Sequence, residues 1–119
     1  LVVCAHDGPM PQTRFVLRKA LEHKLKLVVL INKVDRKDAR PAEVPDEVMS
    51  LLIDLGAPED LLEAPVLFAS AREGKSGRSM AEFHACTTGL APVLDALLER
   101  IPAPAVQPEA PFQMAIAQC

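Results

Sequence analysis

Three short apolar runs, each followed by a polar turn, dominate the pattern of this chain. They cover residues 1–5, 27–31 and 65–69, and each is too short and too uniformly apolar to be an amphipathic helix. Strands that are apolar on both faces are typical of a parallel sheet covered by helices on both sides. We therefore expect three buried strands whose carboxyl ends lead into polar loops.

Amphipathic segments separate the apolar runs and predict the crossover helices of the sheet. The first helix is expected over residues 14–24, with Thr13 as its N-terminal cap. Its buried face would carry Phe15, Val16, Ala20 and Leu21. Strands that alternate with helical segments predict an α/β fold, a parallel sheet with crossover helices.

The remaining segments complete this predicted fold. A second helix is expected over residues 45–55 and a short helical turn over 58–63. The stretch 73–89 is rich in Gly, Ser and Thr and indicates a long loop, within which 80–86 can form a helix. A last helix is expected over 91–100. Its inward residues would be Val93, Leu94, Leu97, Leu98 and Ile101.

The chain changes character after this last helix. Four prolines fall within residues 102–111 and predict a stiff, extended linker. From Phe112 onward, apolar and polar residues alternate with the period of two that indicates a strand with one wet face. We therefore divide the chain into residues 1–101, the linker 102–111, and residues 112–119 as the first strand of a truncated second domain.

Composition limits the function classes. The chain has 119 residues, enough for one domain with a real core, and aromatic residues are only 3%, so the core is aliphatic. The formal net charge of −3 argues against coating nucleic acid, and no direct DNA binding is expected. The densest basic patch is formed by Arg14, Arg18, Lys19, Lys24 and Lys26.

The cysteines and the lengths of the apolar runs indicate the compartment. Cys4, Cys86 and Cys119 are odd in number and fit no disulfide framework, so a reducing, cytoplasmic compartment is expected. No apolar run approaches the roughly 20 residues needed to cross a bilayer, and no membrane partner is expected. His84 and Cys86 are too few ligands for a zinc site, so no metal is expected there.

Polar residues follow the second and third predicted strands directly. Ligands of parallel α/β sheets bind outside the carboxyl ends of the strands, so residues 32–35 and 70–72 are expected at one edge. Guanine presents two adjacent donors, N1–H and the exocyclic amine, and one carboxylate can accept both. Adenine has an acceptor at N1 that a carboxylate would repel. Asp35 is therefore the candidate guanine reader, and an ordinary polar turn is the alternative reading of 32–35.

The neighbouring residues fit the same ligand. Asn32 can both donate and accept, so it can face the purine ring and brace a neighbouring loop. The methylene stem of Lys33 can lie over the base. The backbone N–H of Ala71 can donate to guanine O6, and Ser70 can hold that loop by a local hydrogen bond. Arg72 completes the second loop.

Residues 69–76 read Ala-Ser-Ala-Arg-Glu-Gly-Lys-Ser, one residue away from the phosphate-binding pattern Gly-x-x-x-x-Gly-Lys-Ser/Thr. That pattern needs a Lys-Ser pair that opens a helix below the phosphates. Here Ala69 belongs to the strand, and Gly77 follows Ser76 directly, which weakens a helix start. We therefore expect 74–76 to be a flexible loop tail, and an ATP-type enzyme built on this loop is a disfavoured alternative.

Together these motifs resemble a known family. Asn32-Lys33-Val34-Asp35 followed by Ser70-Ala71-Arg72 has the order and setting of the two guanine-reading motifs of regulatory GTPases. The stretch Asp-Gly-Pro-Met-Pro-Gln-Thr-Arg at residues 7–14 resembles the segment after the switch regions of translational GTPases. With Arg36, the Ala-Arg-Pro of 39–41, and residues 101–104 leading to 111–114, the whole chain except 73–89 most resembles the BipA/TypA ribosome-associated GTPases.

The resemblance implies a partial P-loop GTPase G domain without its front half, followed by the start of a β-barrel domain. It implies that Asn32, Lys33, Asp35, Ser70, Ala71 and Arg72 hold the guanine of GTP or GDP. It also implies a ribosome partner, and GTP hydrolysis in the full-length protein. The family's phosphate loop and Mg²⁺ ligands would lie before residue 1, so Mg²⁺ is expected only in the full-length protein and no catalytic residue in this chain.

A non-catalytic structural or interaction fragment of the same fold is the competing expectation. Without a front half, the sheet would present an unpaired edge and exposed apolar surface.

Overall fold

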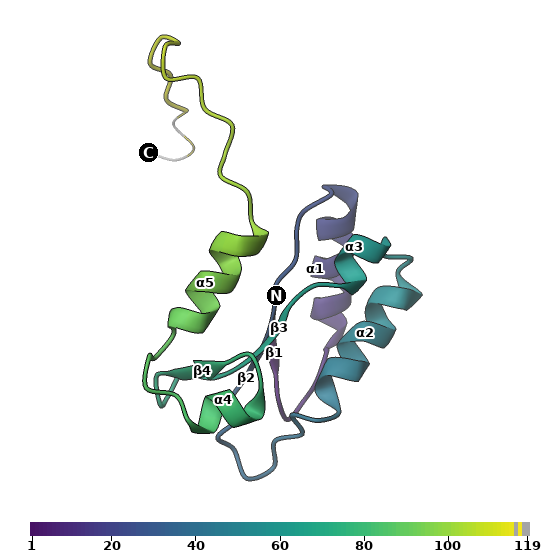
Figure 1. The fold of residues 1–119 in the computed structure, drawn as a ribbon. Helices are drawn as coiled ribbons and strands as arrows, with labels where there is room; N and C mark the ends of the chain where they lie inside the picture. Colours follow the sequence, from purple (N-terminus) through teal and green to yellow (C-terminus); the bar gives the residue numbers. More distant parts are fainter. Residues whose placement is uncertain (116, 118–119) are drawn as a thin grey trace.

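A four-stranded sheet with helices on both faces forms the described part of the chain (Figure 1). The structure is a computed structural model that describes residues 1–115 and residue 117. In spatial order the strands are β1 (Val2–Cys4), β2 (Val29–Asn32), β3 (Val66–Ser70) and β4 (Lys75–Gly77). The first three are parallel, and β4 runs antiparallel to β3. The predicted α/β fold with a parallel sheet is confirmed, with one antiparallel strand added at its edge.

Five helices accompany the strands in the described residues. They are α1 (Pro11–Glu22), α2 (Val44–Asp54), α3 (Glu59–Leu62), α4 (Met80–His84) and α5 (Ala91–Arg100). Helices α1 and α2 lie on one face of the sheet and α5 lies on the other (Figure 1). None of these helices has both the length and the apolar character needed to span a membrane.

Alternation of side chains along the strands divides the core into two layers. Val29 and Ile31 belong to the larger layer, between the sheet and helices α1 and α2. Its other buried members include Val3, Leu17, Val44, Val48 and Leu52. Val28 and Leu67 belong to the smaller layer and pack with Ala96 of α5. Because β2 and β3 are covered on both faces, their apolar runs are continuous rather than alternating.

Helix α1 begins earlier than predicted. Its first residue is Pro11, whose fixed φ suits a first helical turn, and Met10 is the N-terminal cap. Thr13 is therefore not the cap. It occupies the third helical position, where its Oγ1 accepts the backbone N–H of Met10 at 3.0 Å.

The buried face of α1 also differs from the prediction. Phe15 and Val16, expected inward, are 62% and 53% exposed, whereas Leu17 is only 1% exposed. Ala20 and Leu21 are half-buried, as expected for inward residues. Leu17 and Leu21 lie four residues apart and therefore on one helical face, and this face meets the sheet.

Helix α5 exposes most of its predicted apolar stripe. Leu94 and Leu98 are 59% and 82% exposed, and Leu97 and Ile101 are also exposed. The helix packs on the sheet through Val93 and Ala96, which lie three residues apart on one face. This contact turns the leucines away from the sheet, and no other element of the described chain covers them.

The stretch 73–89 is more ordered than the predicted loop. Lys75–Gly77 forms β4, which the sequence did not indicate because it lacks the residues favoured in strands. The helix expected within 80–86 is confirmed as α4. Gly77 is required where β4 meets α4, since a Cβ at this position would clash with the backbone N of Phe83.

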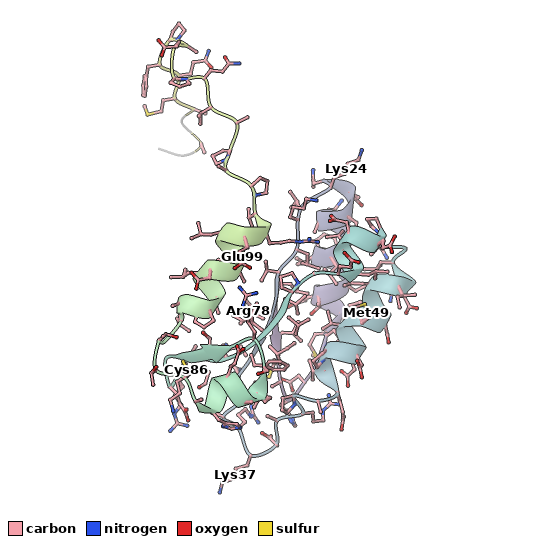
Figure 2. The ribbon with its side chains drawn as sticks, in the orientation of Figure 1. Lys24, Lys37, Met49, Arg78, Cys86 and Glu99 are labelled. Carbon is pink, nitrogen blue, oxygen red and sulfur yellow. The ribbon has the colours of Figure 1, made fainter. Side chains whose placement is uncertain are left out.

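An ion pair joins this hairpin region to the opposite helix. The Nη2 of Arg78 lies 3.0 and 2.9 Å from the two carboxylate oxygens of Glu99 on α5 (Figure 2). Both side chains are about half exposed. An exposed pair of this kind contributes little free energy, so the apolar contacts of Ala96 remain the main attachment of α5.

The segment after α5 extends away from the sheet (Figure 1). Residues 112–115 carry no strand, and Phe112 and Met114 are 88% and 71% exposed. A strand needs a partner, and none lies beside them in the described residues. Ile116, Gln118 and Cys119 lie outside the described residues. The second domain from residue 112 onward therefore stays a prediction.

The two surfaces of α5 generate a stability prediction. Leu67→Ala should lower the free energy of unfolding by about 2–5 kcal/mol, because it leaves a cavity beneath the helix. Leu98→Ala, at an exposed position, should change it by less than about 0.5 kcal/mol. Urea unfolding of the 119-residue chain followed by circular dichroism measures both values. A loss above about 1 kcal/mol for Leu98→Ala would contradict the exposed stripe.

Candidate functional site

The loops after β2 and β3 form one pocket at the carboxyl edge of the sheet. The cavity measures about 300 Å³ and is lined by Asn32, Lys33, Asp35, Arg36, Ala71 and Arg72. Five of the six residues predicted for the site therefore line one cavity. The sixth, Ser70, is fully buried and does not line the cavity. The cavity volume is at the lower end of the range usual for small-molecule pockets.

Asn32 ties the two loops together. It is the last residue of β2 and is half-buried. Its Oδ1 accepts the backbone N–H of Ala71 at 3.1 Å. This bond agrees with the expectation that Asn32 braces a neighbouring loop, and it fixes the distance between the two walls of the pocket.

The turn after Asn32 has a constrained backbone. Lys33 adopts a φ of +65°, a left-handed conformation that is uncommon for residues other than glycine. Val34 is buried, and its N–H donates to the carbonyl of Ala69 at 3.2 Å. Val34 thus anchors the turn to β3, while the exposed Lys33 lines the cavity. Backbone strain of this kind persists where the surrounding structure enforces it, often at ligand sites.

Asp35 is held as an ionised carboxylate. A hydrogen bond with the Ser70 hydroxyl is the main cause that lowers the pKa of Asp35, and the positive charges of Arg72 and Arg36 lower it further. Ser70 is itself fixed, because its Oγ accepts the N–H of Glu73 at 3.1 Å. Ser70 therefore holds its own loop, as expected, and its hydroxyl also lowers the pKa of the Asp35 carboxyl.

The loop after β1 lies against this site without lining the cavity. Arg40 donates from Nε and Nη2 to the carbonyl of His6, at 3.1 and 3.0 Å, and from Nη1 to Glu47 on α2 at 2.7 Å. Gly8, with a φ of +70°, passes so close to Glu47 that a Cβ would collide with its carboxylate. This network attaches the third loop of the sheet edge to α2 and orients it beside the pocket.

The phosphate-loop alternative for residues 69–76 is excluded by the backbone. Lys75 and Ser76 lie in strand β4 and do not open a helix. Ser76 is 1% exposed, and its Oγ donates to the carbonyl of Gly89 at 2.8 Å. Neither the hydroxyl nor a helix N-terminus is therefore available for a phosphate at this position. The expected flexible loop tail at 74–76 is also wrong, because Lys75 and Ser76 pair with β3.

The described residues do not form a metal centre. No group of three or more His, Cys, Asp or Glu side chains converges in residues 1–115 and 117. Cys86 donates its S–H to the carbonyl of Gly89 at 3.4 Å, and both Cys4 and Cys86 are free thiols. The family resemblance implies Mg²⁺ only in the full-length protein, and no Mg²⁺ ligand is assigned to these residues.

Arg36 lines the pocket, although the sequence pointed to it only as part of the family resemblance and not as a nucleotide contact. It follows Asp35 directly, and its side chain lines the same cavity. The feature of the sequence that could have identified Arg36 is Asp38, a carboxylate two residues further on. Asp38 now holds the guanidinium through two hydrogen bonds.

Comparisons with known proteins match nearly the whole chain. Residues 1–103 match the model of the elongation factor Tu GTP binding domain. The chain is 47% identical over 118 residues to the large ribosomal subunit assembly factor BipA of Haemophilus influenzae. It is 46% identical to that of Salmonella typhimurium and 43% identical to that of Buchnera aphidicola. In each case the match covers 99% of this chain and 19% of the relative, so the chain spans about a fifth of the relatives' length.

The link between Ser70 and Asp35 generates a titration prediction. Ser70→Ala should raise the pKa of Asp35 toward its ordinary value, because the carboxylate loses its main hydrogen bond. The depressed pKa stabilises the fold above the unfolded-state value of about 3.9, and this stability is lost as the pH falls through the folded-state pKa. Ser70→Ala should therefore destabilise the protein more at pH 7 than at pH 2.

Carbon-13 NMR titration of the Asp35 carboxyl measures the shift directly. Ser50→Ala, on the exposed side of α2, is the matched control and should leave the Asp35 pKa unchanged. An unchanged Asp35 pKa in Ser70→Ala would show that the hydroxyl does not stabilise the carboxylate.

Proposed function

The chain belongs to the elongation factor Tu GTP-binding domain family, and on that premise we propose that it binds the guanine base of GTP or GDP. The observation that carries the proposal is that three groups lie at one pocket: the ionised carboxylate of Asp35, the backbone N–H of Ala71 and the amide side chain of Asn32. The proposed contacts are Asn32, Lys33, Asp35, Ser70, Ala71 and Arg72.

Asp35 distinguishes guanine from adenine in this proposal. Its carboxylate accepts the N1–H and the exocyclic amine of guanine together, while adenine would place an acceptor against it. A charge-assisted hydrogen bond contributes roughly 1.5–3 kcal/mol. The lowered pKa of Asp35 supports this role, because only the ionised form accepts both hydrogens.

In the same proposal, Ala71 and Asn32 contact atoms of guanine other than the two donors that Asp35 accepts. The Ala71 N–H that now donates to Asn32 Oδ1 would be shared with guanine O6. The amide of Asn32 would then face the purine ring while still bracing the loop. Lys33, turned outward by its left-handed backbone, would cover one face of the base with its methylene stem.

For the longer protein we propose a ribosome-associated translational GTPase that hydrolyses GTP in the cytoplasm. The proposal rests on the family and on the relatives, which are named large ribosomal subunit assembly factors. In it, residues 1–101 supply base recognition, 102–111 form a linker, and 112–119 begin a second domain. Bound Mg²⁺ would supply charge neutralisation at the phosphates, through residues outside this chain.

A structural or interaction role without nucleotide binding is the second candidate. The observation that favours it is exposed apolar surface: Val2 on β1 is 64% exposed, and the leucines of α5 are uncovered. No strand pairs with the outer edge of β1 in residues 1–115. If this surface governs the behaviour of the chain, sedimentation analysis should show association that increases with concentration.

Substitution of Asp35 tests the proposed function. In the longer protein, Asp35→Asn should weaken GDP binding by about ten- to a hundredfold and favour xanthosine diphosphate, whose ring carries an acceptor where guanine has its amine. Fluorescence titration with labelled nucleotides measures both affinities. Asp54→Asn, an exposed α2 residue, is the matched control. An unchanged guanine-to-xanthine preference would contradict the assignment of Asp35.

A further inference from the structure

Arg36 is fixed in one orientation at the wall of the pocket. Its Nε and Nη2 donate to the two carboxylate oxygens of Asp38, at 2.7 and 2.6 Å. This bidentate fork determines the plane of the guanidinium as well as its position. Two of the five N–H groups of Arg36 are engaged in the fork, and the side chain still lines the cavity.

Asp38 is anchored in turn by the loop after β1. His6 Nδ1 lies 3.0 Å from the backbone oxygen of Asp38 and 3.3 Å from its Oδ2. The Arg36 guanidinium lowers the pKa of Asp38 to about 2, so the carboxylate stays charged above about pH 3. The fork therefore persists over the whole pH range in which the protein would be assayed.

The ion pair between Arg36 and Asp38 contributes little to the stability of the fold. The side chains of Arg36 and Asp38 are 42% and 47% exposed, and exposed ion pairs contribute little free energy to folding. The pair holds the planar Arg36 cation at the wall of the cavity with its rotamer already fixed. A planar guanidinium stacks well on an aromatic face, and prior immobilisation reduces the entropy lost on binding.

We propose that Arg36 is a nucleotide-contacting residue whose guanidinium stacks on the face of the bound purine, and that Asp38 is its positioning residue. The inference rests on the proposed function and adds to it a contact with the face of the base, whereas Asp35 contacts the edge of the base. A wall residue contacts the ring face that all purines share. It therefore sets affinity and leaves the choice between purine edges to Asp35.

The test is an NMR titration of the 119-residue chain with GDP and with inosine diphosphate, which lacks the exocyclic amine. Arg36→Met should weaken both nucleotides by roughly three- to thirtyfold and leave their affinity ratio unchanged. Arg36→Lys, which keeps the charge and loses the plane, should weaken both as well. Asp38→Asn should weaken both by a smaller factor, and should add nothing in the Arg36→Met background, because positioning without the guanidinium has no effect.

Matched controls separate this role from bulk charge and from folding. Arg18→Met on α1 and Asp54→Asn on α2 make the same charge changes away from the pocket and should leave both affinities unchanged. Urea unfolding should give similar midpoints for all variants, since the fork is exposed.

The outcomes distinguish the two proposals. If the unmodified chain binds GDP no better than ADP, the proposed function fails and this inference fails with it. If it prefers GDP and Arg36→Met binds as tightly as the unmodified chain, the inference alone is overturned. A changed ratio of GDP to inosine diphosphate affinity in Arg36→Met would also overturn it, because Arg36 would then read the base edge.

Discussion

The parallel pairing of β2 with β3 is the constraint on which the candidate site depends. The two strands run in register, with Asn32 opposite Ala69, so both end at the same edge of the sheet. This register brings Ala71 within hydrogen-bond distance of Asn32 and Ser70 within reach of Asp35. A slip of one residue would turn Asn32 to the other face of the sheet and separate the two loops.

The lining of the pocket contains one anionic side chain and three cationic side chains. The Asp35 carboxylate lines the pocket together with the cationic side chains of Lys33, Arg36 and Arg72. Only Arg36 is held by a full carboxylate fork, because Asp38 is supplied from the same loop and braced by His6. The loop after β1 thus influences the pocket through an ion pair rather than by lining it.

Apolar surface outside the core is a second consequence of the architecture. Helix α5 packs on the sheet through Val93 and Ala96, so its leucines remain in water. The outer edge of β1 has no partner strand in the described residues. Such surfaces are costly in isolation and are usually covered by another segment or chain. They belong to β1 and α5, whereas the candidate pocket is lined by the loops after β2 and β3.

The sequence by itself determined the features that depend on neighbouring residues. Continuous apolar runs predicted β1, β2 and β3, and polar residues directly after two of them predicted the site at Asn32–Asp35 and at Ser70–Arg72. The three strands and the meeting of the two loops at one cavity are confirmed, because strand ends and the loops that follow are local and a parallel sheet gathers them at one edge. The binding role of these residues stays a prediction.

Tertiary structure alone decided which faces were buried and which side chains were paired. Amphipathic patterns placed Phe15 and Leu98 inward, but both side chains are exposed in the described chain. Strand β4 formed because β3 offered a free edge, although Lys75–Gly77 has no intrinsic strand preference. The fork that holds Arg36 likewise depends on a loop conformation fixed by His6 from a distant part of the chain. Burial and pairing depend on contacts between distant segments, which no local pattern encodes.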